Sequence, residues 1–219
     1  MSMLTIDNET TLESFKAAFS GNLAFSVETD SPEGLETYSL SFPWMVTNEF
    51  LEELGESETK QKVSTNLVEN GVKDIMTLLF DGDASTDGTL LGILDGIRTS
   101  TDVADDTTIA GTLEMVDAGR NVFLGPNTGT LVVDLIGDRT PDGESINVPM
   151  NLAVASLLDE KEVFVSDGPL GTLYLIDIDD NEELQAKYME EAEDAVPIVK
   201  RLTFGFVKGE VERYHIRPE

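Results

Sequence analysis

Apolar side chains recur at helical spacing in three stretches of the chain. The first opens with a capping box at Thr10–Glu13 and ends at Gly21. The second covers about residues 46–97 and is interrupted at Gly55 and by a polar loop. The third begins near Asn181 with acidic residues, which the N-terminus of a helix favours. The pattern predicts an N-terminal helix, a helical segment over about 46–97 and a helix over about 181–195.

Alternating apolar and polar residues, the pattern of half-buried strands, occur near both ends of the sequence. Leu23–Val27 and Tyr38–Phe42 alternate in this way and are separated by a turn at Asp30–Gly34. Leu202–Val207 and Val211–Ile216 are separated by a tight turn. Each pair predicts an antiparallel β-hairpin, so residues 181–217 are expected to form a helix followed by a C-terminal hairpin.

Short apolar runs with turn signals between them fill the middle of the chain, over about residues 107–178. The runs expected to be strands are Thr112–Val116, Asn121–Leu124, Thr130–Ile136, Ser145–Pro149, Glu162–Val165 and Thr172–Ile176. Closely spaced turns of this kind are typical of an antiparallel β meander or a barrel-like sheet. We therefore expect an α+β fold in which peripheral helices surround this β-rich body, in a single domain over residues 1–219.

The charge balance narrows the classes of partner. Forty-three acidic and 14 basic residues give a formal net charge of −29. A field of this sign repels nucleic-acid phosphates and anionic lipid headgroups, so we expect neither direct nucleic-acid binding nor a membrane role. Such a surface fits a high-salt cytoplasm, an assembly with a cation-rich neighbour, or a protein that mimics a nucleic acid.

Residue types and motifs that usually carry catalysis are scarce. The chain has no cysteine and one histidine, and it contains no phosphate-binding Gly-x-x-x-x-Gly-Lys loop and no Gly-x-Ser-x-Gly elbow. No signal peptide is visible, and no stretch approaches 18 apolar residues. We expect a protein without enzymatic activity, cofactor or evident small-molecule substrate, located in a virion or the cytoplasm.

An acidic loop offers weak candidates for a metal site: Asp81, Asp83 and Asp87. Oxygen ligands at alternate positions are what a hard cation such as calcium needs. The EF-hand pattern, however, requires Gly at its sixth position and Glu at its twelfth, where this loop has Thr86 and Gly92. A polar surface loop after a helix is the simpler interpretation.

Thr107–Leu113 and Thr130–Asp138 together resemble, in outline, the second half of a von Willebrand factor A domain. In that family a threonine precedes a helix, and a buried strand ends at an acidic metal-site residue. The resemblance implies that Thr108 and Asp138 would help to bind magnesium in a metal-dependent binding module. The family also needs Asp-x-Ser-x-Ser, and the candidate run Asp83–Asp87 lacks the second serine.

Positive charge is concentrated near the C-terminus. The last 20 residues hold five of the 14 basic residues: Lys200, Arg201, Lys208, Arg213 and Arg217. In one interpretation they pair with the acidic body of their own chain. In the other they form an interface that docks on the acidic face of a neighbouring copy and builds rings or filaments.

These features favour a non-enzymatic, self-assembling structural protein whose partners are copies of itself or other assembly proteins. A tail or capsid subunit of a virus or phage is the natural setting, and a high-salt host would account for the acidity. Two alternatives remain open. One is an acidic, nucleic-acid-mimicking inhibitor of a DNA-binding protein, and the other is the von Willebrand factor A-like module.

Overall fold

The structure is a computed structural model that describes residues 5–20, 24–86, 88–141, 145–154, 156–159, 161–192 and 194–217. The chain forms two compact units. Unit 1 consists of Met1–Asn22, Val27–Met76 and Leu173–Phe206. Unit 2 consists of Leu23–Ser26, Thr77–Thr172 and Val207–Glu219.

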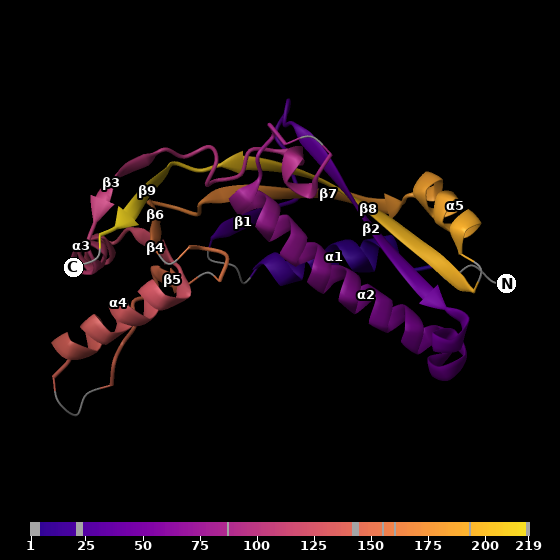
Figure 1. Cartoon of the computed structure of the whole chain (residues 1–219), viewed down its shortest axis with the longest axis horizontal. Coiled ribbons are helices and arrows are strands. Elements are labelled where there is room, and N and C mark those ends of the chain that lie inside the picture. Colours follow the sequence, from indigo (N-terminus) through magenta and orange to yellow (C-terminus); the bar gives the residue numbers. More distant parts are fainter. Residues whose placement is uncertain are drawn as a thin grey trace. The chain divides into compact units, whose positions relative to one another are not determined.

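A four-stranded sheet with the strand order β1-β7-β8-β2 forms the centre of unit 1 (Figure 1). Its strands are β1 (Phe25–Glu28), β2 (Thr37–Thr47), β7 (Gly171–Asp180) and β8 (Ala195–Lys208). β2 is an edge strand that runs antiparallel to β8 along its whole length, from Thr37 opposite Gly205 to Thr47 opposite Ala195.

The helices of unit 1 are α1 (Asn8–Ser20), α5 (Glu182–Glu191) and most of α2 (Asn48–Asp81). The backbone of α2 breaks at Gly55, whose φ of 75° is a left-handed conformation that glycine adopts without steric cost. The remainder of α2 buries Val63 against Val46 and Ile198 of the sheet.

The first helix, α1, packs on the same sheet. The ring centroids of Phe15 in α1 and Phe42 in β2 lie 6.0 Å apart. Phe42 and Val46 are four residues apart on one strand, so both side chains point to the same face of the sheet. That face therefore carries the packing of both long helices in unit 1.

A five-stranded sheet with the order β3-β9-β6-β4-β5 forms the centre of unit 2. Its strands are β3 (Val103–Thr107), β4 (Asn121–Leu124), β5 (Leu152–Val154), β6 (Glu162–Ser166) and β9 (Val211–Ile216). β6 is antiparallel to both of its neighbours, whereas β3 is parallel to β9 and β5 is parallel to β4. The sheet is therefore mixed, and β3 and β5 form its two edges.

Two helices, α3 (Ile109–Asp117) and α4 (Pro126–Arg139), supply apolar side chains to the core of unit 2. Val116 of α3 and Val132 of α4 are buried in one cluster with Val165 of β6. A short 3-10 helix, η1 (Leu90–Ile93), follows α2 along the chain.

The α+β class and the peripheral helices are confirmed, but three of the expected strands are wrong. Thr112–Val116 lies in α3, Thr130–Ile136 lies in α4, and Ser145–Pro149 has no regular secondary structure. Thr108 is the N-cap of α3, because its side chain accepts a hydrogen bond from the Gly111 amide at 3.0 Å. A short apolar run does not show whether it forms a strand or a buried helix. Here the helix cap and the tertiary packing determine that the first two runs are helical.

The strand pairings also differ from the expected antiparallel meander or barrel, since the described residues form two mixed sheets and not a closed barrel. β1 and β2, expected to pair as a hairpin, form opposite edges of one sheet. Both strands of the expected C-terminal hairpin exist, but β8 and β9 belong to different sheets. β8 pairs with β2 over 11 residues, and that long antiparallel ladder outweighs a local turn.

Candidate functional site

The five basic residues near the C-terminus are the interface candidates from the sequence, and Lys200 is the most buried of them. Its side chain is fully buried in β8. Its ammonium donates hydrogen bonds to the Ile6 carbonyl at 2.8 Å, to Asn8 Oδ1 at 2.6 Å and to Asp180 Oδ1 at 2.7 Å. Lys200 thus ties the start of α1 and the end of β7 to the centre of the sheet in unit 1.

Arg201, the next residue along β8, points to the opposite face and reaches solvent. Its Nε donates to Asp179 Oδ1 at 2.9 Å, and Nη2 donates to Oδ2, which makes the pair bidentate. The hydrogen bonds from Arg201 hold the pKa of Asp179 below its usual value. The pair links two adjacent strands on the exposed face.

Arg213 belongs to a buried charge cluster in unit 2. Its guanidinium donates to the buried carboxylate of Glu162 and, at 3.1 Å, to the Arg98 carbonyl. Arg98 in turn donates to Glu162 Oε2 at 2.9 Å and forms an ion pair with Asp81. Two arginines and two carboxylates therefore neutralise one another within the unit, as buried charges require.

Arg217 and Lys208 also donate hydrogen bonds within unit 2. Arg217 is exposed and donates from Nε to Asp106 Oδ2 at 2.7 Å. The Lys208 ammonium donates to the Ser100 carbonyl and to Thr101 Oγ1. All five candidates thus have partners in their own unit, as the intramolecular interpretation expects. Their role as an interface between copies stays a prediction.

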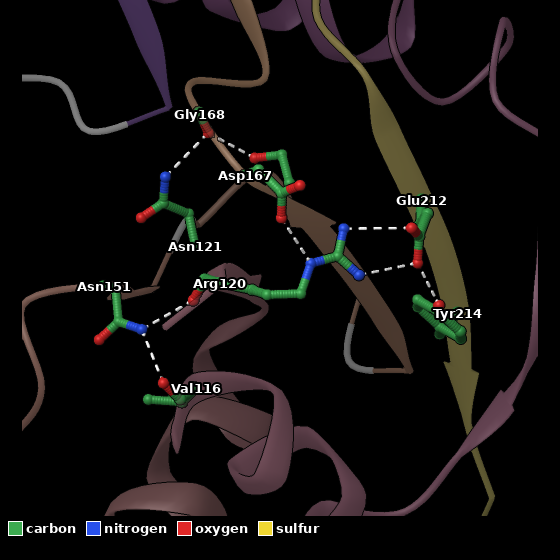
Figure 2. A network of polar contacts seen from close by, with 9 residues as sticks. Val116, Arg120, Asn121, Asn151, Asp167, Gly168, Glu212 and Tyr214 are labelled. Atoms are coloured by element: carbon green, nitrogen blue, oxygen red, sulfur yellow. Dashed lines mark hydrogen bonds and ion pairs between the residues drawn. The ribbon is translucent and has the colours of Figure 1, made fainter. Parts of the chain in front are cut away.

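A second set of polar contacts joins four elements of unit 2 and has Arg120 at its centre (Figure 2). Arg120 follows α3 and donates to Glu212 of β9 through both terminal nitrogens, at 3.0 and 3.1 Å. Its Nε donates to Asp167 Oδ1 at 2.9 Å. The Tyr214 hydroxyl donates to the same Glu212 carboxylate. Sequence analysis missed this network, because Glu212 lies 92 residues from Arg120 and no local motif connects them.

Two asparagines extend the Arg120 network to the backbone. Asn151 Nδ2 donates to the carbonyls of Val116 and Arg120, at 2.9 and 2.7 Å, and so closes the C-terminal end of α3 (Figure 2). Asn121 Nδ2 donates to the Gly168 carbonyl at 2.9 Å, which joins the start of β4 to the turn after β6.

The pKa shifts in this network indicate a structural role for its charged groups and not a role in proton transfer. Hydrogen bonds from Arg120 and then from Tyr214 hold the pKa of Glu212 below its usual value. The same carboxylate raises the pKa of Tyr214 and of Arg120. Each shift favours the state already present at neutral pH, so none of these groups is poised to exchange a proton there.

Two of the three metal candidates in the acidic loop have partners within the described part of the chain. Asp81 is paired with Arg98, and Asp83 Oδ1 accepts hydrogen bonds from the amide and hydroxyl of Ser85. Asp87 lies outside the described residues. Among the described residues, no group of three or more His, Asp or Glu side chains is placed to hold a metal ion.

The magnesium site implied by the von Willebrand factor A resemblance is not supported by the topology. That site needs a buried strand ending at Asp138, but Asp138 lies near the end of α4. Thr108 caps α3 instead of facing such a strand.

No helix within the described ranges is long and apolar enough to cross a membrane.

Comparisons with known proteins identify the architecture. No protein-family model matches the sequence, and no curated protein matches it. Solved structures do match the fold. A chain of the satellite phage P4 procapsid, solved together with its size determination protein, has a TM-score of 0.54 at 11% identity, over 99% of this chain and 94% of the other.

Two further matches come from different particles. A virus-like particle from Pyrococcus furiosus gives a TM-score of 0.54 at 11% identity, over 94% of this chain and 96% of the other. The capsid of a native GTA particle gives a TM-score of 0.59 at 10% identity, over 94% of this chain and 91% of the other. Both units are included in these alignments. The chain therefore shares its fold with chains of the phage P4 procapsid, the Pyrococcus furiosus virus-like particle and the GTA capsid.

Proposed function

We propose that this protein is a non-enzymatic structural component of a virus particle, a capsid subunit that assembles with copies of itself. The observation that carries the proposal is the fold match, which extends over nearly the whole length of this chain and of capsid chains from three different particles. A likeness of that extent leaves little of the chain for a separate active site. We favour a capsid role over a tail role because the structures it resembles form capsids.

The internal charge pairing supports this proposal. Cations from the C-terminal group and from Arg98 and Arg120 are engaged inside the units, so they stabilise the fold and leave the surface strongly acidic. Copies with a net charge of −29 repel one another at low ionic strength. Screening shortens the range of that repulsion from ~30 Å at 0.01 M salt to ~3 Å at 1 M. We therefore expect assembly to need high salt, in line with a high-salt host.

Sedimentation and electron microscopy of the purified protein test the proposal directly. We expect closed particles in molar salt, with a mass far above the 23.9 kDa of one subunit. The melting temperature of the subunit should also rise with salt. A protein that stays at subunit mass at every salt and protein concentration would contradict the proposal. If such a subunit bound a basic DNA-binding protein tightly, with affinity falling as salt rises, the nucleic-acid-mimic alternative would be favoured.

A further inference from the structure

One region of this acidic protein carries almost no charge. Residues 121–133 and 145–158 contain no Asp, Glu, Lys or Arg, and they are the two longest such runs in the sequence. Charged residues make up 26% of the whole chain. Both runs belong to unit 2, so the structure shows whether they lie together.

The fold brings the two uncharged runs side by side. β4, from the first run, pairs with β5, from the second, so that Val122 is opposite Leu152 and Leu124 is opposite Val154. The helix α4 also approaches the second run closely. A side chain at Gly129 would overlap the Val154 side chain, so glycine allows the backbone of α4 to lie against β5.

Large apolar side chains are exposed on this region. Five of the nine exposed large hydrophobic residues in the described part of the chain lie here: Leu131, Ile146, Val148, Met150 and Val154. We call these five residues the apolar patch. Their exposed fractions range from 42% to 92%, with Met150 the highest. Exposed large apolar side chains that are concentrated in one region of a protein are typical of an interaction surface.

The two edges of the five-stranded sheet differ in charge. β3, at one edge, carries the exposed carboxylates Asp105 and Asp106, and charged side chains protect an edge from pairing with other chains. β5, at the other edge, has no charged residue. β2 in unit 1 is also an uncharged edge, but most of its exposed side chains are hydroxyls and Pro43 lacks an amide donor.

We propose that the apolar patch, together with the β5 edge, is the surface by which one copy contacts another in the particle. This inference rests on the proposed capsid function. A second copy is the occupant that fits the charge, because two chains of −29 can approach closely only where neither presents carboxylates. Nucleic acid or an anionic membrane would need a basic surface, and a basic protein would bind the acidic faces instead.

Carboxylates placed in the patch test the proposal. In Met150→Glu/Val154→Glu, like charges would meet across the contact and oppose association. We expect the particle fraction in sedimentation to fall by roughly tenfold or more under conditions in which the subunit remains folded. The control is Met189→Glu, which adds one carboxylate, as Met150→Glu alone does, at an exposed methionine of α5 in unit 1 and should assemble normally. If the double variant does not fold, Met150→Glu alone, at the most exposed position, is used.

The absence of native cysteine allows a second, direct measurement. A Met150→Cys variant has a single thiol, whose reaction rate with a maleimide is measured in dissociated subunits and in particles. Burial at a contact should slow the reaction by roughly tenfold or more in particles. Equal rates in both states, or particles formed as well by Met150→Glu/Val154→Glu as by wild type, would overturn the patch assignment and leave the capsid function standing. Failure of the wild type to assemble at any salt would instead overturn the capsid function and this inference with it.

Discussion

Lys200 and Arg217 belong to the same C-terminal group of basic residues, but their surroundings are opposite. Lys200 is fully buried in unit 1 and donates to three acceptors. The Arg217 side chain in unit 2 is 68% exposed and donates to Asp106. A buried ammonium has no access to water and depends on its protein partners, whereas an exposed pair is already largely solvated. A cluster of like charges in the sequence therefore divides into members that support the fold and members that remain on the surface.

The largest loss of stability is expected when the buried Lys200 is replaced. Lys200→Ala removes the ammonium that joins the Ile6 carbonyl, Asn8 and Asp180, and it leaves a cavity in the sheet. We expect the free energy of unfolding to fall by about 3 kcal/mol or more, measured by urea denaturation. Lys187→Ala, at an exposed position of α5 in the same unit, is the matched control and should change it little. Equal losses of unfolding free energy in both variants would show that the contribution of Lys200 does not depend on its burial.

An intermediate loss of stability is expected when Arg120 is replaced, because its partners are partly exposed. The folded-state pKa of Glu212 lies below its usual value because of hydrogen bonds from Arg120 and Tyr214. A lowered folded pKa gives stability that is present above the unfolded value and is lost as pH falls through the folded one. Arg120→Gln should therefore cost roughly 1 kcal/mol at pH 7. The difference between wild type and variant should shrink below pH 4.5, the ordinary value for this group.

Unfolding curves of both proteins from pH 7 to pH 3 measure this difference. The comparison is needed because protonation of other carboxylates relieves the general repulsion of the chain at the same time. A difference that stays constant over this range would contradict a role for the ionised Glu212 carboxylate.

The smallest change in stability is expected when the exposed Arg217 is replaced. Arg217→Glu reverses one surface charge, and we expect no measurable change in the melting temperature of the subunit. Particle formation by the same variant decides the role of the C-terminal basic group. If Arg217 contacts carboxylates of a neighbouring copy, assembly is lost. If its bond to Asp106 is its only role, particles form as in wild type, and the predicted interface is wrong at this residue.

Local signals predicted that the helices of unit 1 exist, but the capping box at Thr10 was wrong, because α1 begins at Asn8 and Asp7 Oδ1 accepts a hydrogen bond from the Thr10 amide at 2.7 Å. The break at Gly55 and the start of α5 at Glu182 follow from a flexible residue and from acidic residues in a first turn.

The middle of the chain was harder, because runs such as Thr112–Val116 are too short for their period to separate helix from strand. There Thr108 as an N-cap and burial against the sheet decided in favour of helix α3.

The sequence by itself determined the amount of charge, the lack of cysteine and the existence of most helices, because these depend on composition and on neighbouring residues. Only the tertiary structure decided which strands pair, because β9 pairs with β3 and β6, far from it in the sequence, instead of with β8. It also decided which charges are buried. Lys200 and Arg201 are adjacent in the chain, but they lie on opposite faces of one strand, and only the Lys200 side chain is buried.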